Sequence, residues 1–369
     1  MNLNVQNLFS LGGLYMFIDN LEYSWRLKTK QFFLISLLPG KTCINDILQY
    51  FPLVKDLKKL RKGIYLGEKK IQGIVSCFVG DTRESFPAKG MLQPGALHSC
   101  SFCKSELGDQ NFSNEHFNYE KRKRQEIREI QKEMKECYFN NLNIYTLRKI
   151  KRKEKETGIK FQLGNIWINE LELDPTSTCN FPICWFHLLL EGLIKNIFKM
   201  MCHRMSRNHN ILANKRYQKI KLPKGLKRIN KPFGTNHLTS IDIQLLIQFS
   251  FICVVDLVEK KYLDFIYISS YLIKNLYQPT RNKKIDENLH KYIVNFIKCY
   301  KNCSDQNCDR ISNLHIFAQH LEHSIKNNGG MNTLFFALEK YHQWYKPKIW
   351  PTSQKSKKHN ILLFKKRNL

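Results

Sequence analysis

Residues 71–81 read IQGIVSCFVGD, an apolar and β-branched run that ends at an aspartate, Asp81. Short apolar runs of this composition are typical of buried strands. Two earlier runs, LYMFI at 14–18 and FFLISLL at 32–38, predict an antiparallel pair of strands, and residues 45–62 have apolar side chains at helical spacing. We therefore predict the order strand, strand, helix, strand, with Asp81 at the carboxyl end of the last strand, where functional residues gather in α/β sheets.

The rest of the chain has the sequence pattern of helices. Residues 119–136 are almost wholly charged and carry one narrow apolar stripe, which predicts a solvated helix. The tail after residue 346 is basic and polar, and we expect it to be loosely ordered. The predicted fold class is therefore α/β plus all-α. Strongly apolar helical patterns lie at 185–201, 240–276, 289–300, 312–327 and 333–344.

Composition limits the class of protein and its partners. With 43% hydrophobic residues among 369, the chain is expected to be globular. Its 60 Lys and Arg against 31 Asp and Glu give a formal charge of +29, which favours DNA or RNA as a partner. A generally Lys-rich proteome is the alternative explanation of the same excess.

The sequence carries few signals of secretion, membrane insertion or nuclear import. Residues 1–40 lack the pattern of a secretory signal, so we expect a protein that is not secreted and whose cysteines are reduced. No segment reaches the ~18 apolar residues of a membrane span, and the nearest one, 245–258, predicts a buried helix, so no membrane partner is expected. Basic clusters at 121–124 and 151–153 fit nuclear import signals, although a charged helix surface explains them equally well. The expected location is the nucleus, with the cytoplasm as the alternative.

Twelve cysteines in a reducing compartment are better candidates for metal ligands than for disulfides. Cys100 and Cys103 form a CxxC, in which two thiolates are spaced to share one tetrahedral metal. His315 and His320 lie roughly 140° apart around an α-helix, so both can bind one ion if the helix is distorted or ends there. Two ordinary helix histidines are the plainer interpretation. A CxxxxC at 303–308 is either a second metal pair or two loop cysteines.

Two acidic residues are candidates for binding a divalent cation. Asp81 follows a predicted strand and Glu339 lies on a late predicted helix. Carboxylate oxygens suit Mg²⁺ or Mn²⁺, and phosphodiester cleavage by two metal ions needs several of them. The alternatives are a helix cap or turn for Asp81 and a solvated helix face for Glu339.

Six short motifs occur in one order along residues 13–345. They read LYMFI…FLISLLPG, DIL…FPLVKDL, GD…PA…GM…CSFC, FHLLLEG, NLH…H and GG…FALEKY. In this order they resemble the CACTA-type DNA transposases of plants and fungi, within the wider group that includes the V(D)J recombinase. Each motif is weak alone, and the order of all six carries the resemblance.

The resemblance implies a role for each matched residue. Asp81 would be the second catalytic aspartate and Glu339 the closing glutamate of a DDE-type site that binds Mg²⁺ or Mn²⁺. His187 belongs to a family motif. The ligands of a structural zinc ion would be Cys100, Cys103, His315 and His320.

The resemblance also implies an incomplete RNase H-like core that is interrupted by a large helical insertion. Residues 1–103 would hold part of the core with Asp81 and the CxxC. Residues 104–310 would form the mostly helical insertion domain, residues 311–345 the closing core helices with Glu339, and residues 346–369 the basic tail.

Departures from the family pattern bear on activity. The family's first catalytic aspartate has no match, because only about a dozen residues, none of them acidic, precede residue 14. Asp19 falls after the strand and does not match, and Gly330 stands where the family has proline. With two of three acids matched, we expect an N-terminally truncated, partly degenerate copy that is catalytically inactive, unless the reading frame continues upstream of Met1.

Two further interpretations of the sequence differ in class from an inactive enzyme fragment. One is a retained, zinc-stabilised DNA-binding or regulatory protein without catalysis. The other is a translated pseudogene without a stable fold. The expected partners are DNA and, through self-association, a second copy of the chain.

Overall fold

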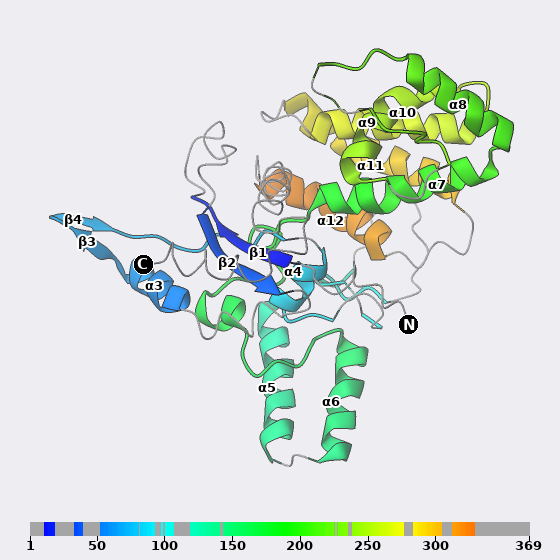
Figure 1. Ribbon diagram of the computed structural model, residues 1–369. Helices are drawn as coiled ribbons and strands as arrows, with labels where there is room; N and C mark the ends of the chain where they lie inside the picture. The colour runs from blue at the N-terminus through cyan, green and yellow to red at the C-terminus, as the bar shows by residue number, and fades with distance from the viewer. Residues whose placement is uncertain are drawn as a thin grey trace, which may run out of the picture.

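Two short antiparallel strands open the described part of the chain, β1 (Leu11–Met16) and β2 (Phe33–Pro39). They confirm the predicted antiparallel pair, and their register changes after Leu14. Figure 1 presents the chain as a computed structural model. It describes residues 11–18, 33–39, 52–80, 82–92, 97–98, 100–106, 119–140, 143–224, 226, 228–234, 238–276, 283–304 and 312–328.

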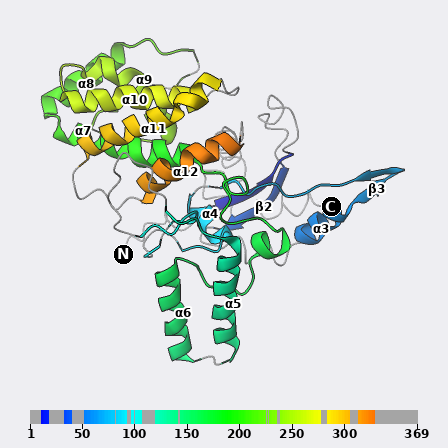
Figure 2. The same ribbon diagram turned by 180° about the vertical axis from the view of Figure 1, so that it is seen from behind.

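A thin hairpin follows helix α3 (Pro52–Lys62), whose end agrees with the predicted helix. Gly63, at a φ of 102° that favours glycine, leads into β3 (Ile64–Leu66), which pairs with β4 (Lys69–Ile71). The hairpin projects from the body in both of the opposite views (Figures 1 and 2).

The strand predicted at 71–79 is wrong beyond β4. Residues 72–80 form an irregular segment, of which only Phe78 is buried, while Ile74 is 77% exposed. The Phe78 amide donates to the carbonyl oxygen of Asn180 at 2.8 Å, and its ring packs against Trp167. A loop therefore provides the backbone hydrogen bond that a neighbouring strand was expected to provide. The sheets of the described residues are two-stranded, so an RNase H-like sheet stays a prediction.

A helical arm leaves the body between the strands and the remaining helices. Its helices, α5 (Arg124–Asn140) and α6 (Ile144–Thr157), run antiparallel and project away from the other described elements in both views (Figures 1 and 2). The solvated helix predicted at 119–136 is thereby confirmed in type, although it begins at Arg124. Ile127 and Met134 of the predicted stripe are buried.

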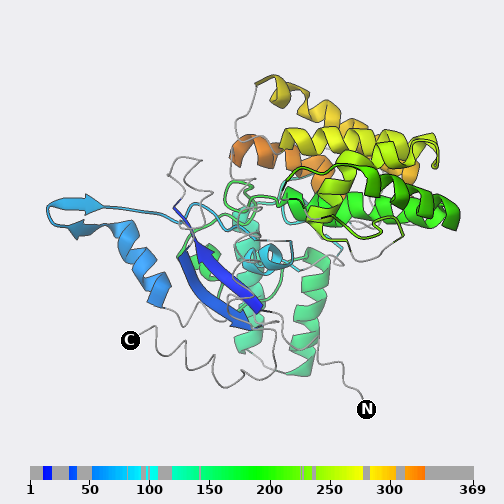
Figure 3. The same cartoon turned by 45° about the horizontal axis from the view of Figure 1, so that its top comes forward.

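The last part of the described chain, residues 186–328, is a bundle of helices that lies to one side of β1 and β2 (Figure 3). Apolar residues cover most of the surface of α9, which therefore needs neighbours on several sides, and it contacts η4, α8 and α10. The helices are η4 (Phe186–Ile194), α7 (Lys195–Arg204), α8 (Arg207–Lys219), α9 (Ser240–Val254), α10 (Lys260–Leu276), α11 (Lys283–Cys303) and α12 (Ser312–Asn328).

Four of the five predicted helical segments are confirmed by this bundle, and the segment at 240–276 forms two helices with a break at 255–259. The helix predicted at 333–344 and the basic tail lie outside the described residues. No helix of the described part is long and apolar enough to cross a membrane.

A continuous apolar core joins the bundle to the CxxC loop. It includes Phe86 of α4 (Thr82–Ala88), Phe102 of the loop, Trp185 before η4 and Phe317 of α12. A smaller cluster around Phe78 joins β1 and α3 to η3 (Ile166–Glu170). The large core brings α12 against the loop that carries the two cysteines. The domain boundaries at 103, 310 and 345 stay predictions.

Candidate metal centre

The CxxC lies on a tight loop after α4. Both Cys100 and Cys103 are buried, with 1% of each residue exposed. The Phe102 amide donates to the Cys100 sulfur at 3.4 Å, so the loop curls around its first cysteine. Upstream, Gly90 has a φ of 69°, and a side chain there would meet Gln131 of α5 at 2.4 Å. The glycine therefore allows the chain to pass close to α5 on its way to the loop.

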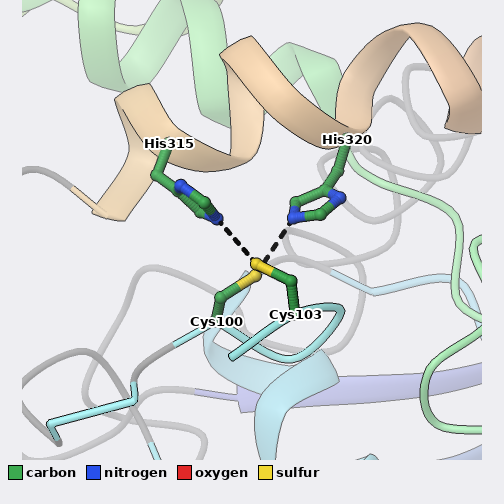
Figure 4. Close-up of side chains that lie close together, drawn as sticks. All are labelled: Cys100, Cys103, His315 and His320. Atoms are coloured by element: carbon green, nitrogen blue, oxygen red, sulfur yellow. Dashed lines mark hydrogen bonds between the residues drawn. The ribbon is translucent and has the colours of Figure 1, made fainter. Parts of the chain in front are cut away.

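The two histidines face this loop from α12 (Figure 4). The helix is α-helical from Ser312 to Asn328, so neither the distortion nor the helix end that ligation was expected to need is present. Their rings approach from the two flanks of one helix face, with centroids 5.2 Å apart. His315 Nε2 lies 3.2 Å from Cys103 Sγ, and His320 Nε2 lies 3.3 Å from Cys100 Sγ.

The four side chains have the separation that a metal ion requires. Their potential ligand atoms all lie within 4.8 Å of one another. In a tetrahedral site with bonds of about 2.0–2.3 Å, neighbouring ligand atoms lie roughly 3.3–3.8 Å apart. The cluster is therefore close to the size of a tetrahedral metal site, and it could hold a metal ion. The ligands are Cys100, Cys103, His315 and His320.

Burial and mutual contacts set the protonation of the cluster. Burial, reinforced by the neighbouring Cys103, raises the pKa of the Cys100 thiol well above its usual value. A hydrogen bond from Cys100 holds the pKa of Cys103 far below its usual value, helped by the two imidazoles. Burial lowers the pKa of His320, which favours its neutral form. A thiolate beside a neutral imidazole is a good pair of metal ligands, since each has a free lone pair.

A buried arginine donates hydrogen bonds to the backbone of the CxxC loop. Arg122 is 5% exposed, and its Nε donates to the carbonyl oxygens of Cys100 at 2.8 Å and Cys103 at 3.2 Å. Its Nη2 donates to the carbonyl oxygens of His98 at 2.9 Å and Thr157 at 2.8 Å. One guanidinium thus ties the CxxC to the end of α6. Its sequence position, inside a run of charged residues, gave no signal of this role.

A buried lysine is the second residue that the sequence did not reveal. Lys89 is 3% exposed, its Nζ donates to the Ser101 hydroxyl at 2.9 Å and lies 3.8 Å from the centre of the Phe102 ring. Burial lowers the pKa of Lys89 to about 7. Ser105 adds a hydroxyl 3.1 Å from Nε2 of His315. The cluster therefore has polar neighbours around its ligands, as metal sites generally do.

The other predicted site residues have different outcomes. Asp81 and Glu339 both lie outside the described residues, so their predicted convergence stays a prediction. His187 lies on η4, where its Nδ1 is 2.9 Å from the sulfur of Cys184, apart from the four clustered ligands. Cys303, one of the two cysteines of the CxxxxC, donates to the carbonyl oxygen of Lys261 at 3.2 Å.

Comparison with known proteins adds no family to this description. Neither the family models nor the curated proteins that were compared gave a match to this chain.

Proposed function

We propose that this protein is a zinc-stabilised DNA-binding protein related to the CACTA-type transposases. The observation that carries the proposal is the convergence of Cys100 and Cys103 with His315 and His320, over separations of 212 and 220 residues. The resemblance depends on the order of motifs along the chain, whereas the convergence is a property of the fold. Two separate lines of reasoning therefore select the same four side chains.

Zinc is the ion that best fits the donors. Two thiolates and two imidazoles form a soft and intermediate ligand set, which suits Zn²⁺ better than Mg²⁺ or Ca²⁺. Four protein ligands complete a tetrahedron and leave no open position for water or substrate. The ion would accordingly stabilise the fold, and its two positive charges would be balanced by the thiolates of Cys100 and Cys103.

DNA is the partner that the charge supports. A formal charge of +29 raises the local concentration of polyanions, and phosphate contacts of this kind do not need to read sequence. In this proposal β1 and β2 belong to an RNase H-like core, and α7 to α11 to a helical insertion. The protein would act in the nucleus.

The metal content of purified protein tests the proposal. We expect one zinc per chain by mass spectrometry, and strong loss of zinc in Cys103→Ser. Cys179→Ser is the matched control, because Cys179 is an exposed cysteine outside the cluster and its loss should leave zinc in place. Retention of zinc by Cys103→Ser, or absence of zinc from the wild-type protein, contradicts the assigned site. Absence of salt-dependent DNA binding contradicts the assigned partner.

A further inference from the structure

The helical arm formed by α5 and α6 offers a surface that the metal centre does not use. One ion pair joins its two helices: Nζ of Lys153 on α6 contacts both carboxylate oxygens of Glu133 on α5, at 3.0 and 2.9 Å. Ile150 of α6 is buried, and so are Ile127 and Met134 of α5. These apolar side chains form the seam of the arm, and exposed side chains line the opposite face of α6.

The two helices differ sharply in charge. α5 carries four basic and four acidic side chains, and ion pairs join Lys132 to Glu136 and Lys104 to Glu126. α6 carries six basic and two acidic side chains. A helix exposed to solvent does not need a net charge, because equal numbers of acidic and basic side chains keep it soluble too. The excess of basic over acidic side chains in the arm therefore lies on α6, and solubility alone does not explain it.

Four of the basic side chains form a ladder along the outer face of α6, defined here as Arg148, Lys149, Arg152 and Lys155. All four are exposed, and helical spacing places Arg148, Arg152 and Lys155 opposite the buried Ile150, with Lys149 at the edge of that face. Among the described residues only Arg152 of the ladder has an ion pair, a 3.5 Å contact with Glu156 that is exposed and so contributes little. The ladder spans roughly 10 Å, the axial rise of about three phosphates on one strand of DNA.

The tip of the arm is apolar and aromatic. Phe139, at the end of α5, is 72% exposed, and Tyr145, in the first turn of α6, is 75% exposed. Ile144 between them is 61% exposed. Aromatic rings beside a row of cations are the combination that binds nucleic acid, because cations follow phosphates and rings stack on bases.

The root of the arm is fixed to the metal centre. Arg122, two residues before α5, donates to Thr157 at the end of α6 and to both cysteine carbonyls. The Leu97 amide donates to the carbonyl oxygen of Lys155 at 3.0 Å. Both helices therefore leave the body from a point that the CxxC loop holds, and the ladder has a fixed direction relative to the core.

We propose that the arm is a nucleic-acid-binding element, in which the ladder contacts the phosphate backbone and the aromatic tip stacks on bases. The inference rests on the proposed function, because it names the surface through which that function would act. An acidic protein surface is the other partner that such a charge attracts. It offers no flat bases for the rings at the tip, so nucleic acid accounts for more of the surface.

Charge removal from the arm tests the proposal. The variant Arg148→Gln/Lys149→Gln/Arg152→Gln/Lys155→Gln is compared with Lys215→Gln/Lys219→Gln/Lys221→Gln/Lys224→Gln, which removes the same charge from exposed positions on and after α8. Binding of a labelled duplex is titrated against salt. We expect the arm variant to lose about 3 from the salt slope, since each phosphate contact contributes about 0.9. The control should change the slope by less than 1.

The outcomes separate the arm from the overall function. If the wild type binds DNA and the two variants lose affinity equally, the arm has no special role and the inference is overturned. If the wild type shows no salt-dependent binding, the proposed function itself fails. Polyglutamate bound as tightly as DNA at equal charge would assign the arm to an acidic protein instead.

The tip is tested separately, in a protein that keeps every charge of the ladder. We expect Phe139→Ala/Tyr145→Ala to weaken binding of an oligonucleotide with unpaired bases by about tenfold, because stacking on bases is lost. Leu163→Ala/Leu226→Ala removes two exposed apolar side chains from outside the arm as a control. Equal effects of the two double variants would overturn the role of the tip.

Discussion

Arg122 is the single side chain on which the most structure depends. Its guanidinium is buried and donates to four carbonyl oxygens, from Cys100, Cys103, His98 and Thr157. Burial lowers its pKa, although a guanidinium remains charged at any ordinary pH. Hydrogen bonds from a charged donor to carbonyls are stronger than neutral ones. Arg122 therefore shapes the CxxC before any ion binds.

We expect Arg122→Ala to lower the free energy of unfolding by about 3 kcal/mol or more, because several buried carbonyls lose a charged donor. Zinc affinity should fall by about 10- to 100-fold, the usual effect of removing a group that supports metal ligands. The measurements are urea unfolding and competition with a zinc chelator. Arg122→Lys keeps the charge but not the fork of donors, and should fall between wild type and alanine. Zinc affinity that is equal in all three proteins would contradict the role.

At the scale of elements, the end of α6 makes a close approach that only glycine permits. Gly158 caps the helix with a φ of 72°, and its amide donates to Glu154 at 2.8 Å. An added Cβ would lie 2.0 Å from the carbonyl oxygen of His98. Gly67, in the turn of the β3–β4 hairpin, has a similar φ of 61° but nothing within 4 Å of the added atom.

The pair Gly158→Ala and Gly67→Ala separates backbone strain from collision. We expect Gly67→Ala to cost about 1 kcal/mol, the strain of a left-handed residue with a side chain. Gly158→Ala should cost about 3 kcal/mol, because a backbone atom at the root of the arm must also move. Both free energies come from urea unfolding. An equal loss of unfolding free energy in the two variants would mean that the backbone at the root of the arm moves easily. The rigid placement of the arm would then be wrong.

The helices could be predicted from the sequence far better than the strands. Apolar periodicity located α5, α9, α10 and α12 because a helix satisfies its own backbone, so its pattern is local. The segment at 72–80 has the composition of a strand, but a strand needs a partner from elsewhere in the chain. Asn180, a hundred residues later, supplies the backbone contact instead, and no local pattern reveals that.

The candidate site could likewise be predicted only in part from the sequence. The CxxC and HxxxxH spacings marked the four ligands, since metal ligation imposes short fixed separations within each pair. Arg122 and Lys89 had no such mark, because a buried cation near carbonyls is identified by its tertiary neighbours. We expected the two histidines to need a distorted or ending helix, and there is a geometric reason why they do not. Two long imidazole side chains reach around one helix face, so the roughly 140° between their Cα atoms does not prevent convergence.

For the whole molecule, the ion would link the CxxC loop to α12, two segments that are far apart in the sequence. The ligands from 100–103 and from α12 enclose more than 200 residues, so a metal bond between them restricts the unfolded chain as a long loop closure does. We expect chelation to lower the melting temperature of purified protein and to increase proteolysis at the arm. The proposed role of the ion would be contradicted by a melting curve that chelation does not shift.

Acid should have the same effect as chelation. The pKa of His320 lies below its ordinary value of 6.5, so an unfolded chain takes up its proton first as the pH falls. The lowered pKa of Cys103 acts in the same direction, since its thiolate favours the folded state at higher pH. Stability therefore decreases as the pH falls below 9.0, the ordinary pKa of Cys103, and more steeply below 6.5, the ordinary pKa of His320. Melting temperatures from pH 8 to pH 5 measure the trend, and stability that rises on acidification would contradict it.

The last prediction concerns strand cleavage, which the transposase resemblance raises and the metal centre does not supply. A centre with four protein ligands has no open position at which water could be activated. Cleavage would instead need carboxylates that hold two divalent ions. The resemblance matches two acids, Asp81 and Glu339. Because the carboxylates of such a site act as a unit, two acids alone should support little activity.

We therefore expect no nicking of supercoiled plasmid with Mg²⁺ or Mn²⁺ under conditions where the protein binds the same DNA. Binding should survive because it depends on surface charge, and it should weaken steeply as salt rises. Asp81→Ala distinguishes a true site from contamination, since a contaminating nuclease ignores the substitution. Nicking by the wild type that disappears in Asp81→Ala would show that two acids suffice, and the protein would then be an active nuclease whose zinc centre supports catalysis from outside the active site.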